Sequence, residues 1–385
     1  MRIGLDARTV GGRFTGDRTY WRGLIGGLAS IAGETNSSEQ DEILLYLREP
    51  LPMDAGIDPL PGNFKWRIVE GRSDRIWSWS GLPRAARQDG VDVIHVQYSV
   101  SPLFSMPVVT TVHDITFRLF PKLFNLRDRT LLNLTVPQSV RRACRVVAVS
   151  ESTRRDILAA FRGTPESKVI TTHLAAGSEF RPLSVADKEA ARVLLRQTYG
   201  ISGPYALAVG VLQPRKNLPM LLKAFRAARR INRLAQSLVV TGKRGWLTAE
   251  IDSALESANG DEREIILTGY VPDEHLPLLY GCADAMFYPS LYEGFGLPPL
   301  EAMASGCPVL ASDTSSLPEV VGDAGILLDP MRPGDWIDAI GRILADEAQR
   351  ERLSAAGLER ARLFDWKRAA VQTLELYKAC HNNTR

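Results

Sequence analysis

The chain has 385 residues, of which 45% are hydrophobic and 24% are charged. At roughly 150 residues per domain, this length predicts two or three domains. The composition is typical of a soluble globular protein and excludes intrinsic disorder, a collagen-like repeat and a small disulfide-rich scaffold. Lysine and arginine number 47 against 44 aspartates and glutamates, a formal net charge of +3. So small a positive excess, with no nucleic-acid-binding motif, argues against a nucleic-acid partner.

The sequence predicts neither a membrane span nor an export signal. No apolar run approaches the roughly 20 residues that cross a bilayer, and Asp6 falls where a secretory signal keeps an apolar run. We therefore expect a cytoplasmic chain. Its cysteines lie far apart without a Cys-x-x-Cys pair and its histidines are scattered, so we expect reduced thiols and no metal site. The cysteines are Cys144, Cys282, Cys307 and Cys380.

Short β-rich runs alternate with helical stretches over the first half of the chain. Several of the runs are continuously apolar, as parallel strands covered on both faces are. The alternation predicts a parallel sheet with helices on both sides. We expect strands at 2–5, 43–46, 66–69, 92–96, 108–112, 145–149 and 169–172, and helices at 20–31, 127–142 and 152–161. The polar tract 33–41 is interpreted as a surface loop.

The alternating pattern starts again after residue 180, where a polar helical stretch at 185–198 precedes a new strand. We expect strands at 205–209, 237–241, 265–268, 285–288, 308–311 and 325–328. The sequence thus predicts an α/β protein with a first domain at 1–180, a second at 181–365 and a final helical segment at 366–385. Ala370, Leu374 and Tyr377 form an apolar stripe on that last helix, spaced by four and three residues.

The segment from Tyr288 to Pro308 carries the most chemical information. A strand ends at its start, a loop with Gly294 and Gly296 follows, and Pro298 begins a short helix, since proline suits the first helical turn. A glycine loop that enters a helix N-terminus offers N–H donors and the positive end of the helix dipole to an anion. The alternative interpretation is that the glycines only turn the chain.

Two glutamates flank this loop. Glu301 lies one turn into the helix, where a carboxylate can accept two hydrogen bonds from a ribose diol. Glu293, eight residues earlier, lies at the loop entrance, where it can hold a second polyol. The alternative for Glu301 alone is that it complements the helix dipole.

A second segment places two cations before a helix. A strand ends near Gly210, and Asn217 is a good N-cap for a helix over 218–230. Arg215 and Lys216 therefore precede a helix N-terminus, where each cation opposes the dipole at a cost on the order of half a kcal/mol. An anion bound between them would resolve this conflict, because arginine offers a planar fork and lysine a point charge to phosphate oxygens. The alternative is a solvated basic turn.

Two further segments lie at strand ends in the first half. His113 and Asp114 follow the strand at 108–112, at the carboxyl edge where open α/β sheets bind ligands. His113 can bond a sugar hydroxyl or stabilise charge near a reacting carbon, although a His-Asp pair is often only a local hydrogen bond. The first loop, 11–20, contains Gly16, which permits close backbone approach to a ligand; a mobile surface loop is the alternative.

Together these segments resemble the retaining glycosyltransferases of the GT-B type, specifically glycosyltransferase family 4. The family's Glu-x7-Glu motif is present as Glu293 and Glu301, and Pro-Arg-Lys-Asn stands at 214–217. The His113-Asp114 pair and the strings Val-Ser-Glu-Ser at 149–152 and Ser-Ser-Leu-Pro-Glu-Val at 315–320 match as well. The resemblance covers nearly the whole chain. It implies two Rossmann-like domains facing each other across a cleft, the first on the acceptor side and the second binding the nucleotide sugar, with the last helix packing back toward the first.

The resemblance also implies roles for individual residues. Arg215 and Lys216 are expected to clamp the donor diphosphate as catalytic residues, with Glu293 and His113 facing the donor sugar. The remaining residues are expected to bind substrate: the amides of Phe295, Gly296 and Leu297 at the diphosphate, Glu301 at the ribose, Tyr270 and Val271 near the base, and Gly16, Asp114 and Gly210.

One departure from the family lies in the first loop, which usually reads Gly-Ile-Gly-Arg-Tyr. Here it reads Gly16-Asp17-Arg18-Thr19-Tyr20, with charged residues at the second and third places. These charges are expected to alter acceptor contacts or loop closure. No Asp-x-Asp motif is present, so we expect the protein rather than a metal to neutralise the leaving diphosphate, and no cofactor beyond the donor.

The strings at 214–217 and 315–320 look most like bacterial mannosyltransferases of polysaccharide assembly. This favours GDP-mannose as donor over UDP-sugars and a glycan or lipid-linked glycan as acceptor. Aromatic and basic residues alternate over 117–145, which leaves open a peripheral contact with an anionic membrane surface beside an ordinary solvated helical layer. A nucleotide-sugar epimerase of the same fold and a non-catalytic nucleotide-sugar-binding subunit are the alternative functions.

Overall fold

The computed structural model describes residues 1–12, 16–34, 41–51, 60–245, 249–256 and 264–382. The chain divides into two compact units: Met1–Leu174 together with Asp365–Arg385, and Ala175–Phe364. The expected polar loop at 33–41 lies mostly outside the described residues. Within the described part of the chain, none of the helices is both long enough and apolar enough to cross a membrane.

The first unit is built on a seven-stranded sheet in the order β3-β2-β1-β4-β5-β6-β7. Every pairing in it is parallel. The central strands β4 and β5 are buried throughout, and most of their residues are apolar or β-branched, as in a parallel sheet covered on both faces. The strands are β1 Arg2–Asp6, β2 Glu42–Leu47, β3 Phe64–Ile68, β4 Val93–Gln97, β5 Val108–Val112, β6 Arg145–Ala148 and β7 Val169–Thr171.

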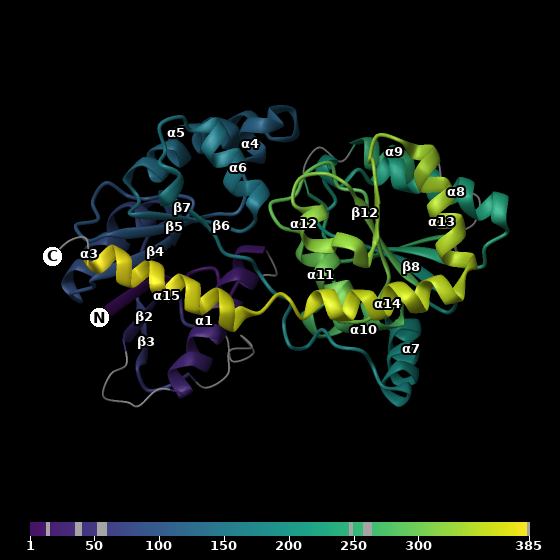
Figure 1. Cartoon of the computed structure of the whole chain (residues 1–385), viewed down its shortest axis with the longest axis horizontal. Helices are drawn as coiled ribbons and strands as arrows, with labels where there is room; N and C mark the ends of the chain where they lie inside the picture. The colour runs from purple at the N-terminus through teal and green to yellow at the C-terminus, as the bar shows by residue number, and fades with distance from the viewer. Residues whose placement is uncertain (13–15, 35–40, 52–59, 246–248, 257–263, 383–385) are drawn as a thin grey trace. The chain divides into compact units, whose positions relative to one another are not determined.

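Helices surround this sheet, and the expected helices at 20–31, 127–142 and 152–161 are confirmed (Figure 1). Asn125 and Ser150 cap α5 and α6 by accepting hydrogen bonds from amides three residues on. The helical elements are α1 Gly16–Glu34, α2 Asp74–Ile76, η2 Trp77–Gly81, α3 Leu82–Gln88, α4 Thr116–Leu119, η3 Pro121–Leu123, α5 Leu126–Arg142, α6 Glu151–Ala160, η4 Glu166–Lys168 and α15 Trp366–Asn382.

The last helix, α15, belongs to the first unit and lies beside α1 (Figure 1). Small residues make this close packing possible: a Cβ on Gly23 would overlap the indole of Trp366, and a Cβ on Gly27 would overlap the Trp366 backbone. Tyr377 of α15 is fully buried. The apolar stripe of the final segment therefore packs within the first unit.

The expectation that all four cysteines are reduced is wrong for two of them. Cys144 and Cys380 form a disulfide, with Cα atoms 5.9 Å apart. These residues are 236 positions apart in the sequence, and only the return of α15 to the first unit brings them together, so spacing along the chain gave no sign of the pair. Cys282 and Cys307 are free and buried.

The second unit has a six-stranded parallel sheet in the order β10-β9-β8-β11-β12-β13. Its strands are β8 Tyr205–Val209, β9 Ser237–Thr241, β10 Ile265–Gly269, β11 Ala285–Tyr288, β12 Val309–Ser312 and β13 Ile326–Leu328. Its helical elements are α7 Val185–Tyr199, η5 Pro214–Lys216, α8 Leu218–Asn232, α9 Ala249–Glu256, η6 Asp273–His275, α10 Leu276–Cys282, α11 Leu297–Ala304, α12 Leu317–Val321, η7 Gly322–Ala324, α13 Pro333–Ala345 and α14 Glu347–Ala361.

The parallel order of the second sheet determines where its chemistry gathers. Because all six strands run the same way, the loops that follow them emerge at one edge of the sheet. The order also reverses direction beside β8, since β9 lies on one side of it and β11 on the other. Ligands of open α/β sheets bind at such a switch point, and the loops after β8 and β11 are those that carry the expected cations and the Glu-x7-Glu motif.

Candidate active site

The loop after β8 presents the two expected cations on a single turn. Pro214–Lys216 forms one turn of 3₁₀ helix, η5, which places Arg215 and Lys216 side by side ahead of α8. Asn217 takes the expected N-cap position of α8, but its side chain makes no capping hydrogen bond. Asn217 adopts left-handed backbone dihedrals (φ 53°), and its amide donates to the carbonyl of Pro330 at 3.0 Å instead of capping α8.

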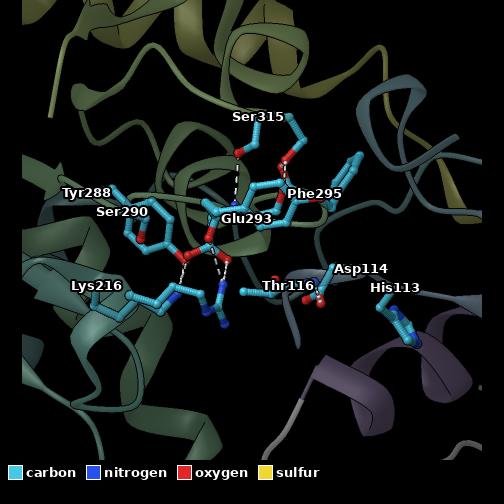
Figure 2. Close-up of polar contacts among 12 residues, drawn as sticks. His113, Asp114, Thr116, Lys216, Tyr288, Ser290, Glu293, Phe295 and Ser315 are labelled. Carbon is cyan, nitrogen blue, oxygen red and sulfur yellow. Dashed lines mark hydrogen bonds and ion pairs between the residues drawn. The ribbon is translucent and has the colours of Figure 1, made fainter. Parts of the chain in front are cut away.

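Both cations point at one carboxylate (Figure 2). Arg215 Nη1 lies 2.5 Å from Glu293 Oε2, and Lys216 Nζ lies 2.6 Å from Glu293 Oε1. Arg215 also donates to the carbonyl of Tyr292 at 3.0 Å. Burial raises the pKa of Glu293, but the charges of Arg215 and Lys216 outweigh it and lower that pKa to about 2. Glu293 is therefore ionised at neutral pH and balances one of the two positive charges, which leaves a net positive cluster.

Serines hold the loop that carries Glu293. The Glu293 amide donates to Ser315 Oγ at 2.8 Å. The Ser316 hydroxyl donates to the carbonyl of Phe295 at 2.6 Å and lies 3.0 Å from the carbonyl of Glu293. Ser316 is fully buried. These bonds tie the loop after β11 to the segment before α12, so the position of Glu293 does not depend on its ion pairs alone.

The short helix α11 begins directly behind this loop. Gly296 is its N-cap at φ +110°, and a Cβ there would lie 2.8 Å from the Leu317 side chain, so both conformation and space demand glycine. Leu297 is the first helical residue, followed by Pro298 and Pro299, which have no N–H group. The amides at 295–297 therefore lie at the positive end of the helix.

Glu301 lies one turn inside α11 and is only 1% exposed. The Tyr280 hydroxyl of α10 donates to Glu301 Oε2 at 3.1 Å. Burial raises the pKa of the Glu301 carboxyl to about 8. This carboxyl is therefore mostly protonated at neutral pH, and donor hydrogen bonds from a diol would favour its ionised form.

Glycines at the strand ends open space around the cations. Gly210 follows β8 at φ +143°, and a Cβ on it would lie 3.1 Å from Lys216 Cε. Gly210 therefore makes room for the lysine side chain, a role that the sequence analysis did not foresee when it placed Gly210 among substrate contacts. Tyr270 and Val271, the two residues expected near the base, directly follow β10. Val271 is buried, whereas the Tyr270 side chain is 49% exposed.

His113 and Asp114 follow β5 at the carboxyl edge of the sheet in the first unit. The His113 ring packs edge-on against Tyr20 and tilted against Tyr98, with ring centroids 5.1 and 5.6 Å away. Burial lowers the pKa of His113, which the nearby charges of Asp17 and Asp114 partly oppose. Asp114 Oδ1 accepts a hydrogen bond from the Thr116 amide at 2.9 Å (Figure 2), so it shapes the entry to α4.

Within the first loop, Arg13, Phe14 and Thr15 lie outside the described residues. Gly16 is exposed and begins α1. Asp17 Oδ1 lies 3.6 Å from His113 Nε2. The departure from the family pattern thus puts a carboxylate beside the expected catalytic histidine. Arg18 is buried and donates through Nε to the carbonyl of Val10 at 3.3 Å.

Models of two families match the chain. The model of Glycosyl transferases group 1 matches residues 196–360, and that of Glycosyltransferase Family 4 matches residues 45–174. O-antigen chain mannosyltransferase B of Escherichia coli is 39% identical over 358 residues, which cover 90% of this chain and 85% of that protein. The chain is a family 4 glycosyltransferase.

Other relatives and solved structures agree with this assignment. The serotype-specific mannosyltransferase WbdA of Escherichia coli is 30% identical over 61% of this glycosyltransferase, a match that covers 28% of WbdA. The sucrose-phosphate synthase of Thermosynechococcus elongatus has a TM-score of 0.73 at 20% identity, covering 98% of each chain. Anabaena HepE in complex with UDP and glucose has a TM-score of 0.71 at 17% identity, covering 98% of this glycosyltransferase and 100% of HepE. At these identities the structures show the fold, which is GT-B.

The structure adds four residues to those expected around this site of the glycosyltransferase. Tyr288, the last residue of β11, accepts a hydrogen bond from Lys216 Nζ (Figure 2). Tyr280 bonds Glu301, and Ser315 and Ser316 fix the loop. The signal for Tyr288 was its place at a strand end, directly before the Glu-x7-Glu loop. Among the residues that the structure describes, no three metal-ligating side chains cluster.

Proposed function

We propose that this glycosyltransferase moves mannose from GDP-mannose to a glycan or lipid-linked glycan acceptor with retention at the anomeric carbon, and that it needs no metal ion or other cofactor. The observation that carries the proposal is the pair Arg215 and Lys216, held on one turn by a carboxylate beside the start of α11. The 39% identity to an O-antigen mannosyltransferase supports the choice of sugar and acceptor class.

The largest catalytic contribution is assigned to stabilising the departing nucleoside diphosphate. Negative charge grows on the leaving phosphate oxygens as the glycosidic bond breaks. Arg215 and Lys216 supply fixed positive charge in a site largely shielded from water, where such charge counts for more than in bulk solvent. The amides of Phe295, Gly296 and Leu297 add the positive end of α11.

The remaining residues are assigned to orienting the donor. Glu301 is proposed to accept the ribose hydroxyls, since its carboxyl is buried beside the nucleotide-binding edge. Val271 and Tyr270 are proposed to lie near the base, and His113 and Glu293 near the sugar. Retention through attack on the same face, with the leaving phosphate accepting the acceptor proton, follows the family resemblance, because the described residues offer no clear covalent nucleophile.

A donor panel tests the proposal. The purified chain would be incubated with GDP-mannose, UDP-glucose or UDP-N-acetylglucosamine and with short mannan oligosaccharides or a lipid-linked glycan extract, each with and without EDTA. We expect product only with GDP-mannose, unchanged by EDTA, and NMR of the product should show the anomeric configuration of the donor. Transfer from a UDP-sugar alone would contradict the choice of donor, and an inverted product would contradict retention. Activity that EDTA abolishes and added divalent metal restores would contradict metal independence.

The same assay separates the alternatives. An epimerase would convert the nucleotide sugar without an acceptor, and a binding subunit would leave it unchanged. A catalytically dead control is available in Lys216→Ala, which removes one clamp charge and should abolish transfer while leaving the rest of the unit intact. Product formation that depends on an acceptor and on Lys216 would therefore identify a transferase.

A further inference from the structure

Lys216 must hold its charge at a fixed point although its side chain is flexible. The ammonium sits on a four-carbon stem that carries about 2 kcal/mol of rotamer entropy. Beside it, Arg215 binds the same carboxylate. If Glu293 alone held the ammonium, a ligand that drew Glu293 or Lys216 away would break their ion pair and free the lysine side chain. A further contact is therefore needed to keep Lys216 in place.

Tyr288 provides that contact. Lys216 Nζ donates to the Tyr288 hydroxyl and also lies 4.5 Å from the centroid of the Tyr288 ring. Tyr288 is 2% exposed and ends β11, a strand paired on both sides. Gly210 also borders the lysine stem, since a Cβ there would lie 3.1 Å from Lys216 Cε. The stem thus runs in a slot between Gly210 and Tyr288.

The phenol remains neutral in this position. Burial, together with the charge and hydrogen bond of Glu293, raises the pKa of Tyr288 well above its ordinary value. A neutral phenol can accept from the ammonium and donate to the carboxylate at the same time. Its hydroxyl therefore links the two sides of the cluster, which a phenylalanine cannot do.

We infer that Tyr288 is a positioning residue for Lys216, which holds the ammonium where it meets the diphosphate of the donor as that diphosphate competes with Glu293 for the cation. This rests on the proposed function, because it takes a nucleoside diphosphate as the ligand of Lys216. Tyr288 touches no reacting atom; it acts by keeping Lys216 on the sheet edge rather than in solvent.

Binding of free nucleotides tests this inference. Affinities for GDP and guanosine, and for UDP and uridine, would be measured by calorimetry for the wild type, Tyr288→Phe, Lys216→Ala and Tyr205→Phe. Tyr205 is the matched control, since it is a buried tyrosine of the same sheet whose hydroxyl donates to the carbonyl of Leu279 at 2.7 Å. The ratio of diphosphate to nucleoside affinity isolates the clamp, because general loosening of the unit would weaken both ligands.

We expect Tyr288→Phe to lower this ratio about tenfold or more, the size of a lost hydrogen bond to a charged group. Tyr205→Phe should leave the ratio unchanged, and Lys216→Ala should lower it at least as far as Tyr288→Phe. If Lys216→Ala lowers the ratio but Tyr288→Phe matches Tyr205→Phe, the positioning role is wrong. If Lys216→Ala itself leaves the ratio unchanged, the diphosphate clamp of the proposed function is wrong.

Discussion

Lys216 Nζ lies 2.6 Å from Glu293 Oε1, so the first glutamate of the Glu-x7-Glu motif neutralises a cation expected to bind the donor. Both side chains are largely buried, at 14% and 8% exposure. Under the proposed function, this carboxylate would compete with the donor diphosphate for Lys216. We therefore expect the pair to stabilise the fold and to weaken nucleotide binding.

Removing the charge of Glu293 should separate these two effects. In Glu293→Gln the cations lose their buried counter-charge, so the free energy of unfolding should fall by about 3–5 kcal/mol. Affinity for GDP should rise, because the competing carboxylate is gone. Chemical denaturation and calorimetry measure the two quantities. A variant that is both less stable and weaker in GDP binding would contradict the competition.

The pH dependence of stability should report Glu293 on the acid side. Its pKa is about 2 in the folded chain and 4.5 in the unfolded reference. A carboxyl with a lowered folded pKa stabilises the fold fully above pH 4.5 and loses that contribution as pH falls from 4.5 toward 2. Glu293→Gln should therefore show a flatter decline of stability over this window than the wild type. Parallel declines in the two proteins would refute the assignment.

Glu301 should act in the opposite direction. Burial raises its pKa from 4.5 to about 8, so the folded chain binds a proton there that the unfolded chain has released. The contribution of Glu301 to stability is thus present below pH 4.5 and declines between 4.5 and 8, by at most about 1.4 kcal/mol per pH unit. Glu301→Gln should remove this decline in urea titrations at several pH values, whereas Glu264→Gln should keep it.

Asp17 should tune His113 in the first unit. The carboxylate, 3.6 Å from Nε2, favours the charged imidazole, against burial, which lowers the pKa of His113. In Asp17→Asn that support is lost, so the pKa of His113 should fall further. If His113 must be neutral for transfer, the acid limb of the pH–rate profile should move to lower pH. This coupling would be excluded if Asp17→Asn moved the acid limb to higher pH. It would also be excluded if Asp17→Asn shifted the limb by the same amount in a His113→Gln background.

The disulfide between Cys144 and Cys380 predicts a thiol count of two in the unfolded, unreduced protein. Cys380→Ser should lower the free energy of unfolding by about 2–4 kcal/mol, since the bond closes a long loop. The buried free thiol Cys307 offers a control: Cys307→Ser lies in the other unit and should leave the Cys144–Cys380 bond intact. Four reactive thiols in the denatured wild type would show that the bond does not form.

Much of the fold followed from local patterns. Buried parallel strands such as β4 and β5 are rich in valine and isoleucine, and a glycine, a proline or a capping serine marks many helix ends. The loop over 288–308 was interpreted correctly as strand, loop, short helix and strand, because Gly296 permits left-handed dihedrals that other residues rarely adopt and Pro298 suits the first turn of a helix.

Contacts between residues that are far apart in the sequence could not be predicted from local patterns. The Cys144–Cys380 bond and the contact of Tyr288 with Lys216 join residues brought together only by the sheet order and by α15. Asn217 misled the local analysis, because its side chain found a carbonyl at Pro330 that is far away in sequence. Glu293 was expected to face a sugar, and only three-dimensional proximity shows that it pairs with both cations.

Steady-state transfer by Lys216→Ala, with GDP-mannose and saturating acceptor, tests the central claim most directly. Loss of one preorganised charge at the leaving group should lower kcat by roughly 10²–10³-fold. The unfolding temperature should fall less than in Glu293→Gln, because Arg215 still pairs with Glu293. Lys223→Ala, a lysine on the exposed face of α8, should turn over normally. Near-normal kcat in Lys216→Ala would contradict the diphosphate clamp on which the assigned mechanism depends.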